Sequence, residues 1–335
     1  MTELLSMEGS TEQVGDDFPP YPSGPYSPGF FVGGFGGSPF QTCGGSSNGK
    51  VVTKLGVWKN SSCLQGIQVT YNDGTQTQVY GSVRGDYAQI TFKPGEKVVE
   101  LTLWGNGNGT RTGRIKLTTD GGQTFDHGKD TSGQTAYSAP VGGGLLVGVA
   151  GRCAVEIDML GLVFFTDVKS VSITGINYVN PPTGTSNGIA LALLQTTTYT
   201  NPGTEPLKWK FDNTIARTDS TSMSQSATLQ YGVEVSVSAS FFDFAKVGTS
   251  YSWSMTQEKT SKSTVTTEKT LSWSLEGRLD PGDKITALAT CYVGTVNVDY
   301  TATVTVTMKS GETFHYDEPG VLSNVLCSEA SATAS

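Results

Sequence analysis

The amino-acid sequence predicts an all-β protein. Glycine accounts for 42 of the 335 residues, apolar and polar residues alternate over many short runs, and no apolar stripe of helical period reaches a useful length. Alternation with a period of two puts the apolar side chains on one face of a strand. Glycine supplies the tight turns that separate short strands. The chain is therefore expected to fold as many short strands, in two or three domains.

Composition divides the chain into four segments. Residues 1–30 are rich in proline, glycine and tyrosine and lack the branched apolar residues of a core, so we expect disorder there. Residues 31–182 hold strands punctuated by glycine turns, and residues 183–188 continue an Asn-Pro-Pro stretch that is typical of a linker. Residues 189–335 change to serine and threonine alternating with valine, tyrosine and alanine. Two folded domains are therefore expected.

Charge and hydropathy restrict the partners of the chain. The net charge of −8 disfavours nucleic acid and gives no attraction to anionic lipid. No run of eighteen apolar residues is present, so no transmembrane helix is expected. The start, Met1–Ser10, lacks the basic and apolar regions of a secretory signal. We therefore expect a protein made in soluble form, cytoplasmic or vesicular or exported by an unconventional route, that later reaches a target membrane.

Neither a metal, a cofactor nor catalysis is indicated. The five cysteines are widely spaced without a CxxC pair, and the chain has only two histidines. A Cys43–Cys63 bond and a Cys291–Cys327 bond would each stay within one domain, but the spacing leaves the connectivity open. The motifs GxSxG and HExxH and a phosphate-binding P-loop are missing, so we expect no enzyme.

Three parts of the first domain resemble a jacalin-like lectin. They are Gly33–Phe40 at its start, Leu101–Gly105 followed by Gly113–Leu117 in the middle, and Gly151–Gly161 near its end. The resemblance implies a β-prism whose glycan site is built by loops at one end. The unbroken chain through the Gly-Gly loop resembles the mannose-preferring branch of that family. Mannose-type glycans on cell surfaces or vesicles are therefore the implied partners.

The same resemblance assigns the carbohydrate-binding residues. In that family an aspartate carboxylate, two main-chain N–H groups before it and a glycine of the Gly-Gly loop hold the sugar hydroxyls. These positions fall on Asp158, Glu156, Val155 and Gly37. The chemistry is suitable, because a carboxylate accepts two hydroxyl hydrogen bonds and glycine lets the ring approach the main chain. The competing interpretation is that Asp158 only caps a turn.

The second domain contains one pattern written twice, in opposite directions, between residues 231 and 255. In each arm, apolar positions alternate with positions that are almost all serine, threonine or glycine. Residues 231–241, at about 3.3 Å each and tilted by roughly 45°, rise through about the thickness of a hydrocarbon core. One face therefore suits lipid and the other water. The predicted lipid face consists of Tyr231, Val233, Val235, Val237, Ala239, Phe241, Tyr251, Trp253 and Met255.

The tip of this hairpin also indicates a membrane contact. Phe241, Phe242 and Phe244 stand where a soluble hairpin would favour Asn-Gly or Asp-Gly. Glu234 and Asp243 are pH-sensing candidates, since protonating them would lower the cost of passing the hairpin through lipid. A strand of a soluble sandwich alternates in the same way, so an ordinary structural role is the competing interpretation.

Residues 189–335 resemble the aerolysin-type pore-forming module, and the order of domains resembles the jacalin–aerolysin, natterin-like family. The resemblance implies an elongated twisted β-sheet, glycan-directed docking, homo-oligomerisation on a lipid bilayer and insertion of hairpin 231–255 as a transmembrane β-barrel. Residues 264–275 and 296–308 alternate without an aromatic tip and are expected to be scaffold strands. The alternative is a non-lytic lectin or membrane-trafficking protein that uses the second half as a spacer. A toxic, immune or endosomal role stays open.

Overall fold

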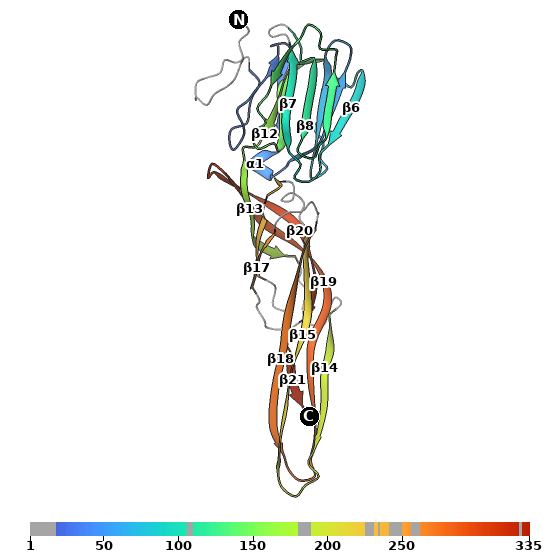
Figure 1. The fold of residues 1–335 in the computed structure, drawn as a ribbon, viewed down its shortest axis with the longest axis vertical. Coiled ribbons are helices and arrows are strands. Elements are labelled where there is room, and N and C mark those ends of the chain that lie inside the picture. Colours follow the sequence, from blue (N-terminus) through green and yellow to red (C-terminus); the bar gives the residue numbers. More distant parts are fainter. Residues whose placement is uncertain are drawn as a thin grey trace.

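The structure is a computed structural model, which describes residues 18–105, 110–179, 189–224, 231–233, 235–240, 250–255, 262–327 and 330–335. Within these residues the fold is nearly all β, as the sequence predicts, with a single four-residue helix, α1 (Gly45–Asn48). The molecule is elongated: a compact head formed by the N-terminal half stands at one end of a long, twisted sheet (Figure 1).

The head is a β-prism. Its described strands form three four-stranded antiparallel sheets, which enclose one core. In the order of pairing, the first sheet contains β1 (Val32–Gly33), β12 (Ile157–Phe164), β11 (Leu146–Cys153) and β2 (Ser38–Cys43). The second contains β10 (Thr135–Ser138), β7 (Val98–Gly105), β8 (Arg114–Thr119) and β9 (Thr124–Gly128). The third contains β5 (Tyr80–Gly81), β4 (Leu64–Tyr71), β3 (Val52–Lys59) and β6 (Asp86–Thr91).

Strand alternation builds this prism core. Along β8, Ile115 and Leu117 are fully buried whereas Lys116 between them is exposed. Burying each such side chain contributes about 1.5–3 kcal/mol. Strand β12 is buried along its whole length, because one face packs into the prism and the other, through Met159 and Val163, packs into a second core. The strand that contains Asp158 is therefore packed on both faces.

The N-terminal segment differs from the expected disorder over residues 18–30. Tyr26 forms a β-bridge with Phe165 and stacks on its ring, with the ring centroids 5.5 Å apart. Phe18 meets Phe35 edge-on at 5.1 Å, and the hydroxyl of Tyr21 donates to the carbonyl of Ser27. The expectation of disorder was wrong for residues 18–30. This segment has few branched apolar residues, but its aromatic rings supply the apolar surface that packs against the domain. Residues 1–17 lie outside the described residues.

The described strands of the second half form a nine-stranded sheet. Its main path runs β17 (Ser250–Met255), β16 (Val235–Ser240), β13 (Val168–Tyr178), β19 (Lys284–Met308), β20 (Thr313–Cys327), β15 (Leu207–Ser224) and β18 (Lys262–Leu279). Strands β14 (Ile189–Thr200) and β21 (Ser331–Ala334) also pair with β19. The strands predicted at residues 264–275 and 296–308 are present within β18 and β19.

The division between the domains differs from the sequence-based boundary. Strand β13 lies before residue 182, yet it pairs along β19 and not with the prism. Its buried residues Val171 and Ile173 belong to the second core, which explains the pairing. The long sheet therefore begins at β13, and the expected linker, residues 183–188, lies outside the described residues.

The second core joins the two halves. Phe165 from the end of the head stacks on Phe314 of β20 at 5.4 Å, and Phe314 stacks on Tyr316 at 6.3 Å. Gly49, just after α1, packs so closely on Tyr316 that a Cβ atom there would overlap the ring. The head and the sheet are therefore in firm contact.

Cys43 and Cys63 do not form the bond considered from their spacing, since both are free thiols. Burial raises the pKa of each thiol to about 11, which keeps it protonated. The other pairing involves Cys327, whose side chain lies outside the described residues.

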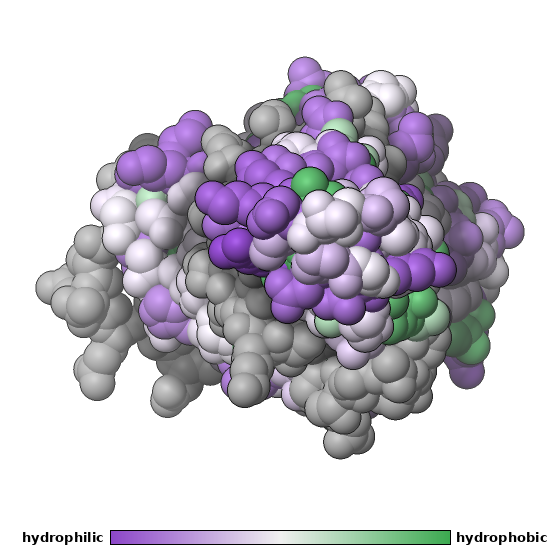
Figure 2. Space-filling model, turned by 90° about the horizontal axis from the view of Figure 1, so that it is seen from below, coloured by the Kyte–Doolittle hydropathy of each residue, from purple (hydrophilic) through white to green (hydrophobic). Residues whose placement is uncertain are grey.

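No helix in the described ranges is long and apolar enough to cross a membrane. No group of three or more His, Cys, Asp or Glu side chains in these ranges could hold a metal ion. Seen from below, the coloured residues are a mixture of hydrophilic and intermediate ones, with smaller hydrophobic areas (Figure 2).

Candidate functional site

The predicted glycan site forms where the Gly-Gly loop meets the start of β12. The main-chain N–H of Gly34 donates to the carbonyl of Asp158 at 2.8 Å, while Gly33 pairs with Met159. A Cβ atom at Gly36 would lie 2.5 Å from Oδ1 of Asp158, and one at Gly37, whose φ is +60°, would lie 2.7 Å from Oδ2. Only glycine allows this close approach of the loop to the carboxyl.

Asp158 is largely buried, with 9% of the residue exposed. Burial is the main cause that raises the pKa of its carboxyl, and the negative charge of Glu156 raises it further. Arg111, a hydrogen bond from the N–H of Ala154, and Arg152 act in the opposite direction without cancelling the rise. The hydrogen bond from the N–H of Ala154 is also the contact expected if Asp158 only caps a turn.

The structure brings the four predicted carbohydrate-binding residues to one end of the prism. Gly37, in the loop between β1 and β2, packs against the carboxyl of Asp158 in β12, and Glu156 lies in the loop between β11 and β12. The side chain of Val155, next to Glu156, is half exposed at 52%. The predicted donors of Val155 and Glu156 are main-chain groups, but the side chain of Glu156 has a further role.

Three residues at this site were missed in the sequence. Arg111, which precedes β8, forms an ion pair with Glu156 through Nε, and its Nε lies 4.0 Å from Oδ1 of Asp158. Gln65 of β4 donates from Nε2 to Oε1 of Glu156 at 3.1 Å. Arg152 donates from Nε and Nη2 to the carbonyls of Gly36 and Gly37, at 3.1 and 2.8 Å. These contacts join distant parts of the chain, so local patterns gave no signal for the contacts themselves, although Arg152 lies within the Gly151–Gly161 segment that resembles a lectin.

The two arms of the predicted hairpin pair with each other as β16 and β17. Its register sets Val235, Val237 and Ala239 opposite Met255, Trp253 and Tyr251, and it sets three serines opposite three serines. Because facing positions of an antiparallel pair lie on the same side, the apolar positions of both arms share one face of the hairpin. At Val235, which is 1% exposed, this face is turned to the interior.

The hairpin is attached to the sheet at its beginning. Strand β16 pairs in parallel with β13 over three positions, from Val171↔Val235 to Ile173↔Val237. Tyr231, just before it, is fully buried in the core shared with the head and donates from its hydroxyl to the carbonyl of Gly49 at 3.2 Å. Val233 packs against the same core. In this state Tyr231, Val233 and Val235 therefore contact protein.

Phe241, Phe242 and Phe244 of the tip, and both pH-sensing candidates, Glu234 and Asp243, lie outside the described residues.

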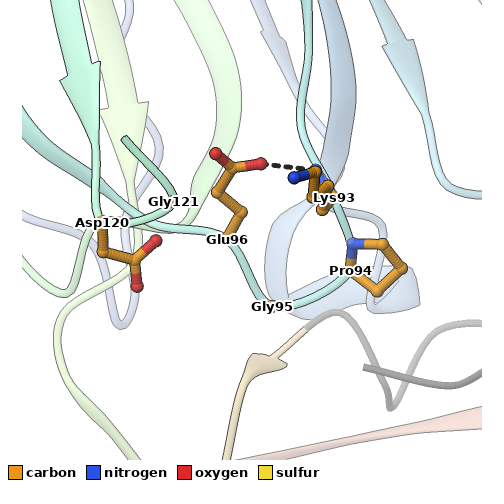
Figure 3. A pocket seen from close by; sticks show the side chains of 6 residues that line it. All are labelled: Lys93, Pro94, Gly95, Glu96, Asp120 and Gly121. Carbon is orange, nitrogen blue, oxygen red and sulfur yellow. Dashed lines mark hydrogen bonds between the residues drawn. The ribbon is translucent and has the colours of Figure 1, made fainter. Parts of the chain in front are cut away.

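A small pocket of about 100 Å³ lies beside the start of the hairpin, between the β6–β7 and β8–β9 turns (Figure 3). Glu96 lines it, but its carboxyl already accepts bonds from the hydroxyl of Thr119, from Gln123 and from the N–H of Lys93. Burial would raise the pKa of Glu96, yet these bonds outweigh it and lower the pKa. The Glu96 carboxyl therefore stabilises the β6–β7 and β8–β9 turns.

Comparison with known proteins identifies the head. Residues 31–163 match the sequence model of the jacalin-like lectin domain. These residues form a jacalin-like lectin domain. Nearly the whole chain is similar in fold to the crystal structure of lamprey immune protein, with a TM-score of 0.75 and 22% identity, covering 93% of this chain and 99% of that one. The predicted fold class, a β-prism followed by an elongated twisted sheet, is thereby confirmed.

Shorter matches include Malaysian banana lectin, at 26% identity and a TM-score of 0.34, covering 41% of this chain and 96% of that one. Artocarpin, solved in complex with mannotriose, matches at 21% identity and a TM-score of 0.33, covering 40% of this chain and 95% of that one. No curated protein matches.

Proposed function

We propose that this protein is a glycan-targeted pore-forming protein of the jacalin–aerolysin type. The lectin domain docks on a glycosylated surface, protomers associate there, and hairpin 231–255 of each enters the bilayer as part of a shared β-barrel. The observation that carries the proposal is the register of β16 with β17, which gathers apolar positions on one face and serines on the other. Such a hairpin matches a barrel wall with lipid outside and water inside.

The short ladder that attaches the hairpin to the sheet is consistent with its release. The ladder between β13 and β16 covers three positions, whereas β15 and β18 pair over eighteen, from Leu207↔Leu279 to Ser224↔Lys262. Freeing β16 from β13 therefore breaks far fewer main-chain bonds than freeing a scaffold strand. In lipid every strand edge must be paired, so the hairpin is stable there only when neighbouring copies close the barrel. Homo-oligomerisation on the membrane is thus part of the proposal.

Glycan recognition supplies the docking step. The net charge of −8 gives no electrostatic attraction to anionic lipid, so another contact must hold the protein at the surface. Asp158 and the Gly33–Gly37 loop provide an acceptor beside a main chain that a sugar ring can approach. We propose mannose-type glycans as the ligand, since the chain passes unbroken through this loop. The protein acts first in soluble form and then on the target membrane, and no catalytic step is involved.

Leakage of vesicles that carry mannose-type glycans tests this function. The wild-type protein should release a trapped dye from such vesicles and form oligomers, and free mannose should inhibit both. Val237→Asp, on the apolar face of the hairpin, should abolish leakage but leave lectin binding intact. Ser238→Asp, on the opposite face, is the matched control and should still permeabilise.

Two results would contradict the proposal. The first is a wild-type protein that binds the vesicles densely and never releases dye. The second is equal loss of leakage in Val237→Asp and Ser238→Asp while both proteins remain folded. Sugar-inhibitable agglutination without leakage would favour a non-lytic lectin that uses the long sheet as a spacer. The burial of Tyr231 and Val235 as ordinary core residues is the observation that favours this second function.

A further inference from the structure

The glycan site contains an ion pair that the sequence did not reveal, and its two members act on the central carboxyl in opposite directions. We propose that Arg111 is a positioning residue which keeps Asp158 ionised for sugar binding, while Glu156 holds Arg111 in place and opposes its effect on Asp158. This inference rests on the sugar-binding part of the proposed function.

The geometry places the pair beside the carboxyl that would receive the sugar. Arg111 contacts Glu156 through Nε, and the same atom lies 4.0 Å from Oδ1 of Asp158. Gln65 fixes the other oxygen of Glu156 from behind, at 3.1 Å. Arg111 keeps 49% of its side chain exposed, so it lies at the mouth of the site, whereas Asp158 lies deeper with 12%.

Asp158 needs this support because it is buried against the Gly-Gly loop. Desolvation penalises the charged form of a carboxyl, and the pKa of Asp158 is raised accordingly. A protonated carboxyl donates through one oxygen, so it no longer accepts two sugar hydroxyls. A nearby guanidinium favours the charged form, since an opposite charge within about 4–6 Å stabilises it.

The groups that face Asp158 come from three elements. The loop before β12 contributes Glu156 and the N–H of Ala154, and the segment before β8 contributes Arg111. Strand β11 contributes Arg152 and Cys153. Burial raises the pKa of the Cys153 thiol, so it is neutral near pH 7 and adds no charge. Arg152 contacts the carbonyls of Gly36 and Gly37 and lowers the pKa of Asp158 less than Arg111 does.

Two neutral substitutions distinguish an electrostatic effect of the ion pair on Asp158 from a purely structural role in anchoring the loop. Arg111→Gln and Glu156→Gln both break the same ion pair, so a purely structural role predicts the same defect in both proteins. If the charges act on Asp158, the two variants diverge: Arg111→Gln raises the pKa of Asp158, and Glu156→Gln lowers it. Arg111→Lys keeps the charge and should stay near the wild type.

The experiment measures mannotriose affinity by calorimetry from about pH 3 to about pH 8. The pH midpoint of binding should move up in Arg111→Gln and down in Glu156→Gln. Arg114→Gln is the matched control, because Arg114 forms an ion pair with Asp126 of the same domain at 2.6 Å. Its midpoint should equal that of the wild type.

A uniform loss of affinity in both variants, with unchanged midpoints, would overturn the inference. A second readout does not depend on the ligand: the carboxyl carbon of Asp158 can be titrated by NMR in the same proteins. If the wild type fails to bind mannotriose, the sugar assignment fails, and the NMR midpoints still decide the role of Arg111. Midpoints that coincide in wild type, Arg111→Gln and Glu156→Gln would refute it.

Discussion

The hydroxyl of Tyr231 donates a hydrogen bond to the main-chain carbonyl of Gly49, 3.2 Å away, although 182 positions separate the two residues. Tyr231 begins the proposed membrane hairpin, and Gly49 ends the short helix of the lectin domain. The ring of Tyr231 also lies 6.1 Å from that of Phe165 at the end of the prism. The lectin domain therefore helps to hold the start of the hairpin in the sheet.

Removing the Tyr231 side chain should loosen the hairpin. Tyr231→Phe loses one hydrogen bond, which is worth about 1 kcal/mol, and Tyr231→Ala leaves a cavity that costs about 3–5 kcal/mol. Urea unfolding measures both losses, and limited proteolysis between residues 231 and 255 should be faster in Tyr231→Ala. Tyr87→Ala, at a surface position that is 47% exposed, is the control. Wild-type protease resistance in Tyr231→Ala would show that this contact does not hold the hairpin.

The position after Tyr231 should tolerate only glycine. Gly232 has a φ of +63°, and a Cβ atom there would lie 2.8 Å from the carbonyl oxygen of Gly95. Gly232→Ala should cost more than the roughly 1–2 kcal/mol of a left-handed backbone alone, because the lectin-domain loop must also shift. Gly74→Ala carries the same type of backbone, with φ +82° and open space around it, and isolates the first cost. Equal falls in Tm for the two variants would exclude the close contact with Gly95.

Gly37→Ala should abolish sugar binding without unfolding the lectin domain. A Cβ atom there would overlap the main-chain carbonyl carbon of Cys153 and lie 2.7 Å from Oδ2 of Asp158, so the Gly-Gly loop must shift away from the carboxyl. Gly122→Ala is the matched control, since its φ is +79° and nothing lies within 4 Å of the added atom. Mannotriose affinity and Tm are measured for both variants. Gly37→Ala should lose binding and keep a folded-protein transition, whereas Gly122→Ala should keep both. Unchanged affinity in Gly37→Ala would place the sugar elsewhere.

Asp158→Asn should separate stability from binding. The folded-state pKa of Asp158 is raised, so its carboxyl contributes stability that is present below its unfolded pKa of about 3.9 and is lost as pH rises through the folded pKa. The neutral amide should therefore stabilise the protein at neutral pH, with a gain that shrinks in acid, while sugar binding is lost. Thermal unfolding across pH tests the sign. A loss of stability at neutral pH would mean that the charge is favourable in the fold.

The sequence predicts repeating structure better than contacts between distant residues. Alternation located the strands of the hairpin and assigned Val235 and Met255 to one face, because side-chain period is a local property. The register that sets Val235 opposite Met255 comes from the structure. The same alternation could not show that Tyr231 is buried beneath Gly49, nor that β13 leaves the prism to pair with β19. Both depend on tertiary packing.

In the predicted glycan site, too, local motifs were found in the sequence but contacts between distant residues were not. Gly37 and Asp158 were found through the resemblance of their motifs, and the fold brings them together. Arg111 carries no motif of its own, and it reaches Glu156 only because the prism folds two loops to the same end. The aromatic residues of the N-terminal segment were misjudged because composition cannot show that Tyr26 finds Phe165.

The environment of successive residues in β16, measured on glycan-bearing vesicles, tests the central proposal most directly. Single cysteines at positions 235 to 240, in a protein without other reactive thiols, would carry a polarity-sensitive dye. Blue-shifted emission is expected at positions 235, 237 and 239, and aqueous emission at positions 236, 238 and 240, in the assembled state. Uniform aqueous emission along the strand would contradict the central proposal.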